Sequence, residues 1–202
     1  METSITIERE VKFLLTSRED GERRLTAVGA ELVKPRHFEE NRLFDFDQNP
    51  LAERGKTIRL RRAGGEAWLT FKGPLRQGFG GQGPTLGPAR IKERLEIETA
   101  LESADAMTEI LLELGLSETF RYEKYRACYR SEDLFITLDE TPIGDYVEIE
   151  GAPDAIEEMA GRLGFSMDAS IGLSYPRLYQ IRRQESPELP ADMTFREAVS
   201  GR

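Results

Sequence analysis

Charged and apolar side chains alternate along residues 5–14, which read ITIEREVKFL. Successive side chains of a β-strand point to opposite faces, so Glu8, Glu10 and Lys12 share one face and the apolar residues share the other. The length of the segment and its period of two therefore predict a strand with one charged face. For any single strand, such a face is most simply explained by contact with water.

The same arrangement recurs in six further segments, each with charged residues on one face and Ile, Leu, Val or Phe on the other. These predicted strands are residues 56–62, 67–72, 90–99, 119–130, 134–140 and 146–150. Gly64 and Gly65 predict a hairpin turn between the first two of them. Residues 31–46 are also extended, and Pro35 favours a bend that divides them into two strands.

Four segments have the apolar spacing and the boundary residues of helices. They are residues 17–29, 103–114, 154–163 and 174–183. Ser17 and Ser103 are predicted N-caps, and Pro176 is tolerated near the start of the last helix. Each helix needs an apolar surface to pack against, and the apolar faces of the strands offer one.

No linker divides the chain, so we predict one domain over residues 1–184 and a loose tail over residues 185–202. A capping-box pattern from Thr194 to Glu197 predicts a helical turn within the tail. Residues 73–88, GPLRQGFGGQGPTLGP, have no periodicity and predict a long mobile loop. A flexible hairpin connection is favoured there, and a lid over a site is the alternative.

If the helices cover the apolar faces, the charged faces point inward around a common axis. A closed antiparallel barrel satisfies this condition and leaves no strand edge exposed. The fold class is therefore predicted as α+β, with helices packed on the outside of the barrel. Its interior would hold Glu8, Glu10, Lys12, Arg59, Arg61, Lys72, Lys92, Arg94, Glu96, Glu98, Lys124, Arg126, Asp139, Glu148 and Glu150.

So many charges can be enclosed only in a wet and mutually paired interior. Carboxylates without nearby imidazole or thiolate groups select Mg²⁺ or Mn²⁺ over zinc. Clustered Arg and Lys side chains bind phosphate oxygens. A divalent cation between carboxylates and a polyphosphate satisfies both groups, and this combination is what phosphoryl transfer requires.

Composition narrows the function further. The 202 residues carry a formal charge of −9, which disfavours a duplex nucleic-acid partner. The basic residues are concentrated in a few strands, and this arrangement in an acidic protein suits a small polyanion. One cysteine and one histidine exclude a disulfide framework and ordinary zinc clusters, and the cysteine fits a reducing cytoplasm. We expect no membrane partner, because no apolar run of about 18 residues and no signal peptide is present. A homodimer is left open.

The ordered motifs resemble those of the CYTH family, the triphosphate tunnel metalloenzymes. Glu8, Glu10 and Lys12 match the family's Glu-x-Glu-x-Lys signature. The remaining matches are NRLFD at residues 41–45, TIRLRR with Arg59 and Arg61, TFKG with Lys72, ERLEIE with Arg94, Glu96 and Glu98, KYR with Lys124 and Arg126, LDETPIGDYVEIEG with Asp139, Glu148 and Glu150, and SYPRL at residues 174–178. The resemblance covers about residues 3–183. Residues 41–47 lack the family's usual Tyr, so no substrate contact is assigned there.

The resemblance implies an eight-stranded antiparallel tunnel that binds a triphosphate with divalent metal. It implies metal ligands at Glu8, Glu10, Glu148 and Glu150, together with Asp139, and supporting roles for Glu96 and Glu98. Substrate-binding residues would be Lys12, Arg59, Arg61, Lys72, Arg94, Lys124 and Arg126. Among all of these, Lys12, Arg59, Lys72 and Glu148 are the expected catalytic residues.

Three functions remain open at this stage. The leading hypothesis is metal-dependent hydrolysis of inorganic triphosphate or a small organic triphosphate. The first alternative is an adenylate cyclase of class IV type, which converts ATP to cyclic AMP and diphosphate. The second alternative is a polyphosphate-binding or nucleotide-binding module without turnover.

Overall fold

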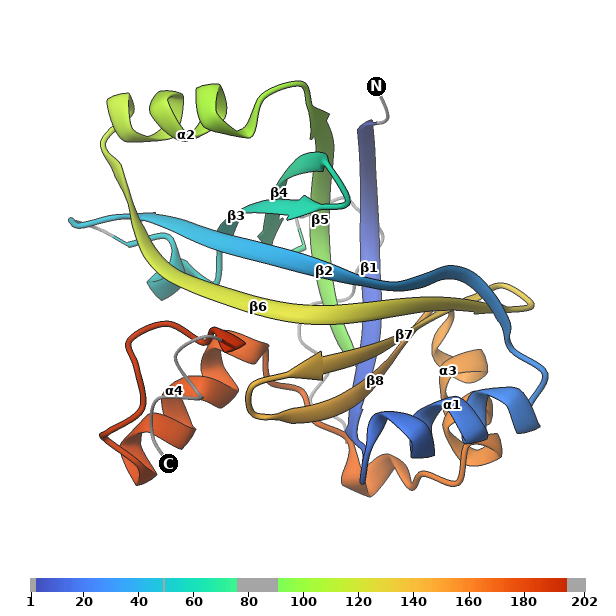
Figure 1. The fold of residues 1–202 in the computed structure, drawn as a ribbon. Helices are drawn as coiled ribbons and strands as arrows, with labels where there is room; N and C mark the ends of the chain where they lie inside the picture. Colours follow the sequence, from blue (N-terminus) through green and yellow to red (C-terminus); the bar gives the residue numbers. More distant parts are fainter. Residues whose placement is uncertain (1–2, 49, 76–90, 196–202) are drawn as a thin grey trace.

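The computed structural model describes residues 3–48, 50–75 and 91–195. Within these ranges, eight antiparallel strands form a closed barrel in the order β1-β5-β4-β3-β2-β6-β7-β8 (Figure 1). The strands are β1 (Thr3–Leu14), β2 (Glu31–Phe46), β3 (Thr57–Ala63), β4 (Glu66–Gly73), β5 (Lys92–Leu101), β6 (Leu116–Ser131), β7 (Leu134–Thr141) and β8 (Gly144–Glu150). The predicted α+β class and closed eight-stranded barrel are confirmed.

Helices lie on the outside of the barrel, as the apolar strand faces predicted (Figure 1). In the described residues they are α1 (Arg18–Ala27), α2 (Ala104–Glu113), α3 (Pro153–Arg162) and α4 (Tyr175–Glu185), with short 3₁₀ turns at Ala52–Arg54 and Met167–Ala169. The serine N-caps are confirmed, because the hydroxyls of Ser17 and Ser103 accept the backbone N–H groups of Asp20 and Ala106 at 3.3 and 3.1 Å.

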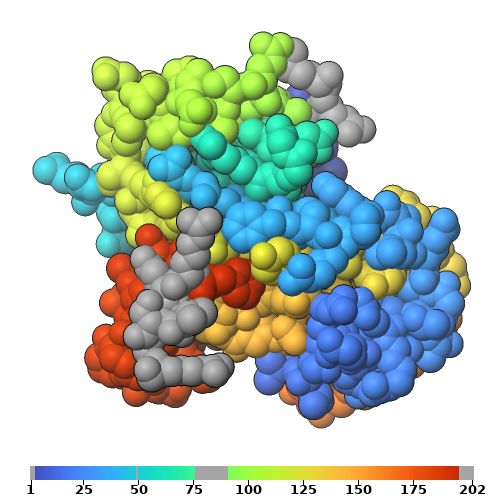
Figure 2. Space-filling view, viewed as in Figure 1, coloured from blue at the N-terminus to red at the C-terminus, as the bar shows by residue number. Residues whose placement is uncertain are grey.

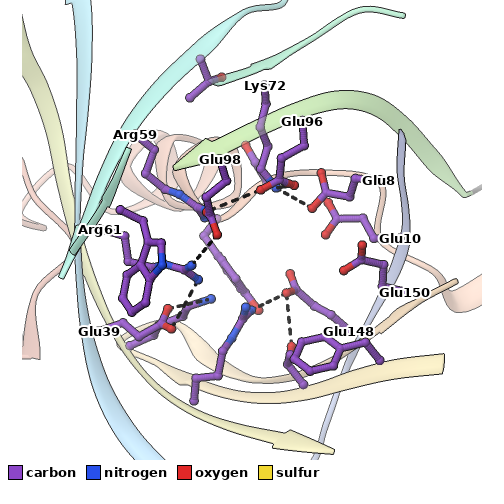
Figure 3. Close-up of a pocket in the computed structure, with 18 of the residues that line it drawn as sticks. Glu8, Glu10, Glu39, Arg59, Arg61, Lys72, Glu96, Glu98, Glu148 and Glu150 are labelled. Carbon is purple, nitrogen blue, oxygen red and sulfur yellow. Dashed lines mark hydrogen bonds and ion pairs between the residues drawn. The ribbon is translucent and has the colours of Figure 1, made fainter. Parts of the chain in front are cut away.

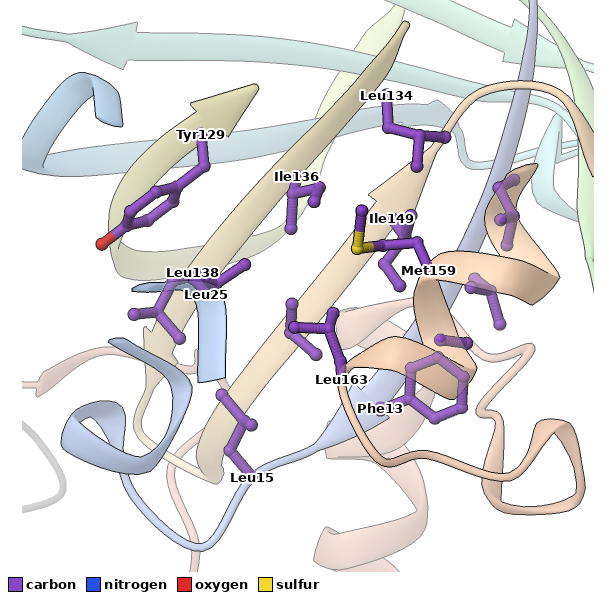
Figure 4. Close-up of a cluster of buried hydrophobic side chains, with 14 of the residues drawn as sticks. Phe13, Leu15, Leu25, Tyr129, Leu134, Ile136, Leu138, Ile149, Met159 and Leu163 are labelled. Atoms are coloured by element: carbon purple, nitrogen blue, oxygen red, sulfur yellow. The ribbon is translucent and has the colours of Figure 1, made fainter. Parts of the chain in front are cut away.

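The largest apolar core lies between the outer face of the barrel and helices α1 and α3 (Figure 4). Ile136, Leu138 and Ile149 point outward from β7 and β8 and are at most 2% exposed. They meet Leu25 of α1 and Met159 of α3, which are equally buried. Because these outward faces supply the hydrophobic core, the opposite faces of the same strands are left to line the interior.

Close packing of α1 on β7 depends on a glycine inside the helix. A Cβ atom at Gly21 would lie 2.6 Å from Cδ1 of Leu138 and 2.8 Å from Cδ1 of Leu15. Both distances are shorter than van der Waals contact, so a side chain at this position would push the helix away from the barrel. Gly21 therefore fixes the distance between α1 and the sheet.

The other two helices cover separate parts of the barrel, and Figure 2 shows both at the surface of one face. Helix α2 packs Leu111 against a cluster that includes Phe44 and Leu60. Helix α4 packs Tyr175 and Tyr179 into a third cluster at one end of the barrel. Together the helices cover the apolar outer surface without entering most of the interior.

Two expectations from the sequence differ from the structure. Glu31–Phe46 is one continuous strand rather than two, because β2 absorbs the bend as register shifts against β6 between Leu32 and His37. The described part of the tail is docked rather than loose, since Met193 is fully buried and its backbone bonds to Arg121 and Glu123 of β6.

Two further predictions fall largely outside the described residues. They are the helical turn of the tail, apart from Thr194 and Phe195, and residues 76–88 of the predicted loop. Within the described ranges, the structure contains no helix with the length and apolar character needed to cross a membrane.

Candidate active site

A cavity of about 530 Å³ runs through the barrel and is lined by side chains from all eight strands and from the start of α4. Its size is within the range of small-molecule sites. Thirteen of the fourteen predicted site residues line it: Glu8, Glu10, Lys12, Arg59, Arg61, Lys72, Arg94, Glu96, Glu98, Lys124, Arg126, Glu148 and Glu150. Figure 3 shows the labelled members pointing into one central space from different strands. The period-two argument therefore placed these side chains on the correct face.

Three carboxylates gather on one side of the cavity, where Figure 3 shows Glu8, Glu10 and Glu150 together. Glu10 faces Glu150 directly across the β1–β8 pair. Glu8 accepts Lys72 at 2.5 Å and Glu10 accepts Lys92 at 2.9 Å. Within the described residues, Glu150 has no hydrogen-bond or ion-pair partner. Burial, followed by the neighbouring charges of Glu8 and Glu96, raises its pKa to about 7.

Another carboxylate of β8, that of Glu148, lies between two cations instead. Its oxygens lie 2.7 Å from Nζ of Lys12 and 2.5 Å from Nη2 of Arg126. Burial opposes ionisation of Glu148, but these two cations outweigh burial and hold its pKa well below the usual value. Burial likewise opposes protonation of Lys12, yet Glu148 keeps the pKa of that amine raised. Glu148 is therefore an anion that neutralises the basic wall beside it.

Asp139 occupies a different place from the one expected of a metal ligand. It is fully buried behind the cavity wall, outside the residues that line the cavity. Its two oxygens accept bonds from Nε and Nη2 of Arg126 at 2.6 and 2.5 Å, from Lys124 at 3.1 Å and from the hydroxyl of Tyr175 at 2.8 Å. These contacts make Asp139 an internal anchor for two cations that face the cavity.

On the side of the cavity opposite Glu8, Glu10 and Glu150, the wall is basic, and its Arg and Lys side chains pair with nearby carboxylates. Arg59 lies 3.5 Å from Glu98 and 4.0 Å from Glu96, and Arg61 lies 3.0 Å from Glu98. Lys72 lies 3.1 Å from Glu96. Glu96 and Glu98 thus act as counter-ions of Arg59, Arg61 and Lys72.

Arg94 and Lys124 lie at the edges of this arrangement. Arg94 donates to the backbone oxygen of Gly55 at 2.8 Å, at the end of the cavity where β5 begins. Lys124 is 2% exposed and lies 3.6 Å from Glu39 as well as 3.1 Å from Asp139. Lys124 is thus more deeply enclosed than a residue that contacts substrate freely.

The sequence analysis missed three site residues. Glu39 is 3% exposed and contacts Lys124 and Arg61; burial opposes its ionisation, but the charge of Lys124 outweighs burial and lowers its pKa. Asn41 is fully buried, and neither of its side-chain polar atoms has a partner among the described residues. Tyr175 stacks under Lys12 at 4.3 Å. Alternation could not single out Glu39 and Asn41, because Glu40 and Arg42 place charge on the other face of the same segment.

The donors suit a hard divalent cation, although they are not assembled around one. Among the described residues, no three His, Cys, Asp or Glu side chains converge closely enough to hold an ion. The acidic side nevertheless offers only oxygen donors, including a buried Oε2 of Glu8 without a partner and the unpaired Glu150. Oxygen donors of this kind match Mg²⁺ or Mn²⁺.

The charge balance of the cavity leads to the same requirement. Its described lining holds nine Lys or Arg and seven Glu side chains. With Asp139 behind the wall, the excess is a single positive charge. A triphosphate carries several negative charges, so an accompanying cation is needed to bring the filled cavity close to neutrality.

Comparison with known proteins is consistent with this geometry. The model of the CYTH domain family matches residues 6–162. A protein of Methanocaldococcus jannaschii, named "putative adenylate cyclase", is 26% identical over 153 residues. That match covers 75% of this chain and 81% of the relative.

Two solved structures share the fold. A Vibrio parahaemolyticus protein, named "putative adenylate cyclase", has a TM-score of 0.71 at 18% identity, over 87% of this chain and 98% of its own. A Hippeastrum protein, described as a "putative adenylyl cyclase" with a dominant triphosphatase activity, has a TM-score of 0.60 at 18% identity. It is matched over 87% of this chain and 96% of its own. At these identities the likeness is one of fold.

Proposed function

Because the chain belongs to the CYTH domain family, we propose that its tunnel binds a small triphosphate with a divalent cation and hydrolyses an anhydride bond. One observation carries the proposal: basic side chains from four strands meet a cluster of carboxylates in a single cavity. The basic group comprises Lys12, Arg59, Arg61, Lys72 and Arg126. A scaffold without a ligand would gain nothing from enclosing these charges.

Binding exchanges one set of counter-ions for another. In the absence of substrate, Glu96 and Glu98 neutralise Arg59, Arg61 and Lys72. An entering phosphate chain offers oxygens of the same charge and more suitable geometry for the two guanidinium groups. The displaced carboxylates remain nearby and keep the substrate in register by repelling it from the wrong wall.

The carboxylates on the other side are the candidate cation ligands. Glu8, Glu10, Glu148 and Glu150 would hold Mg²⁺ or Mn²⁺, which supplies positive charge to the phosphate oxygens when it is bound. Asp139 is not among them, because it is fully buried behind the wall and does not line the cavity, whereas Glu148 does. Glu8 and Glu10 now hold Lys72 and Lys92, and a cation on these carboxylates would leave both amines free to contact phosphate.

Hydrolysis is an in-line displacement at the terminal phosphorus. The oxygen of water forms a bond to that phosphorus while the bond to the bridging oxygen breaks, and the electron pair leaves with the diphosphate. The proton that water loses passes to solvent. Arg59 and Lys72 neutralise charge on the transferred group, and a donor in this role contributes roughly 10²- to 10³-fold to the rate. The dominant triphosphatase activity attributed to the Hippeastrum protein supports hydrolysis as the first candidate.

Cyclisation of ATP is the second candidate, and the name of the Methanocaldococcus jannaschii relative favours it. In that reaction the ribose 3′ oxygen forms a bond to the α-phosphorus and displaces diphosphate. The two reactions use the same basic wall but give different products. Incubation with ATP and Mg²⁺ distinguishes them, because cyclisation yields cyclic AMP and diphosphate whereas hydrolysis yields phosphate.

The test of hydrolysis is phosphate release from tripolyphosphate with Mg²⁺ or Mn²⁺. We expect the wild type and E93Q to be equally active, because Glu93 pairs with Arg9 on the outside of the barrel. E148Q and E10Q should lose most of the activity while circular dichroism shows that both remain folded. Equal rates in folded E148Q, E10Q and E93Q would contradict the proposal.

A further inference from the structure

One end of the tunnel differs in character from the charged middle. Trp68 lines the cavity from β4 and pairs with Arg61 across the β3–β4 hairpin, close to its turn. The guanidinium of Arg61 lies 4.7 Å from the centre of the indole ring, and Nζ of Lys34 lies 5.8 Å from it. Ala63, two residues beyond Arg61 on β3, and Cys128, which pairs with Lys34, also line the cavity. An aromatic face, apolar neighbours and a few polar groups are typical of a site for an organic ring.

Around Lys12, by contrast, the aromatic side chains are already packed against one another and against charged groups. Tyr175 of α4 is 5% exposed, donates to Asp139 at 2.8 Å and covers Lys12 at 4.3 Å. Tyr146 packs against Tyr175, with ring centres 5.3 Å apart. Tyr175 is thus committed to internal contacts, whereas Trp68 is a half-buried ring on the cavity wall that a substrate can reach.

Spacing along β4 places this end at a suitable distance from the basic wall. Trp68, Thr70 and Lys72 are successive inward residues, so Trp68 and Lys72 are about 13 Å apart along the strand. Arg59 pairs with Thr70 between them. A phosphate chain held by Lys72 and Arg59 would thus direct its organic substituent at the indole.

We propose that Trp68 is a stacking platform for a neutral planar ring attached to the triphosphate, as in a nucleoside triphosphate. This inference rests on the proposed function and adds the class of substrate. Lys34 has no carboxylate partner in the described part of the chain, so its amine is available to an acceptor atom of the ring. Because Glu98 and Glu39 neutralise Arg61, the charge of Lys34 makes the platform electropositive, which disfavours a cationic ring such as that of thiamine triphosphate.

Trp68 is the one tryptophan in the sequence, so intrinsic indole fluorescence reports on this platform alone. Binding is followed with Ca²⁺ in place of Mg²⁺ to slow turnover. We expect ATP to change the emission saturably, because the base stacks on the ring. Tripolyphosphate contacts Arg61 but not the indole, so it should change the emission less than ATP does, and it should reverse the additional ATP signal by competing for the same basic wall.

Variants of Trp68 distinguish stacking of the indole on a ligand ring from a role of the indole in holding Arg61 in place. By calorimetry, W68A should lose roughly tenfold or more in ATP affinity while its affinity for tripolyphosphate changes much less, and W68F should retain most of the ATP affinity. Equal losses for both ligands in W68A, or tighter binding of thiamine triphosphate than of ATP, would overturn the inference and leave the proposed function standing. Failure of the wild type to bind tripolyphosphate would overturn both.

Discussion

Replacing Glu150 by Gln should make the metal-free protein more stable at alkaline pH. Glu150 is ionised, enclosed and unpaired beside Glu8 and directly opposite Glu10, so the folded state carries a repulsion that the unfolded chain lacks. A neutral amide of the same shape removes that repulsion. The prediction is unusual because most substitutions inside a barrel destabilise it.

The magnitude follows from the pKa of Glu150, which burial and then Glu8 raise from 4.5 to about 7. Since the folded pKa lies above the unfolded one, the cost is absent below pH 4.5, grows between pH 4.5 and 7 and is complete above pH 7. At pH 8 that difference corresponds to at most about 3 kcal/mol. Water in the tunnel screens the charge, so we expect about 1–3 kcal/mol.

The assay is urea unfolding of the wild type and E150Q with a chelator present, at pH 5 and at pH 8. E150Q should unfold at a higher urea concentration at pH 8, and the difference should nearly vanish at pH 5. E148Q is the matched control on the same strand. Its substitution leaves Lys12 and Arg126 without their shared carboxylate, so it should destabilise the protein at pH 8, by about 3 kcal/mol or more.

A wild type at least as stable as E150Q at pH 8 would refute this reasoning. So would a difference between the two proteins that stays the same at pH 5 and pH 8, because the effect would then not depend on ionisation of Glu150. Addition of Mg²⁺ at pH 8 should stabilise the wild type more than E150Q, since a cation relieves the repulsion only where the carboxylate is present.

Three further predictions test the fold and the site. G21A should lower the free energy of unfolding by about 1–3 kcal/mol, because its methyl group would collide with Leu138. Urea unfolding measures this change, and an unchanged midpoint would contradict the close packing of α1. D139N should destabilise the metal-free protein by about 3 kcal/mol by the same assay, whereas a residue that only binds metal would leave metal-free stability unchanged. K72M should slow phosphate release from tripolyphosphate by roughly 10²-fold, and a rate equal to that of the wild type would remove Lys72 from the site.

Alternation predicted which residues face inward because the period of a strand is exact and local. Glu8, Glu10 and Lys12 needed no knowledge of the rest of the chain, and the same held for Arg59 and Arg61. Closure of the barrel followed from the requirement that helices cover apolar faces. The fold class and most of the cavity lining could therefore be predicted from the sequence.

Alternation could not predict whether an inward side chain lines the cavity or lies buried behind the residues that do. Asp139 and Glu148 both follow the alternation, yet Asp139 lies behind Arg126 while Glu148 faces the cavity. Their difference depends on which side chains lie across the strand pair and on the contact of Asp139 with Tyr175 of a distant helix. A period along one strand contains no information about either.

Residues 31–46 show the limit of local rules for strand boundaries. Pro35 favours a break, but pairing with β6 continues on both sides of it through shifts of register. The long partner strand therefore outweighs the local preference of one proline. Glu39 and Asn41 were missed for a different reason: Glu40 and Arg42 on the outer face are also charged, so the segment has no apolar face there to mark the inside.

The central claim is that convergent inward charges, rather than surface charges, perform the chemistry. Arg59 and Arg62 lie on the same strand but on opposite faces, and Arg62 pairs with Asp105 of α2 on the outside. The most direct measurement is phosphate release from tripolyphosphate with Mg²⁺ by the wild type, R59M and R62M. We predict that R62M matches the wild type and that R59M is slower by roughly 10²-fold or more. Equal rates in R59M and R62M would contradict the account.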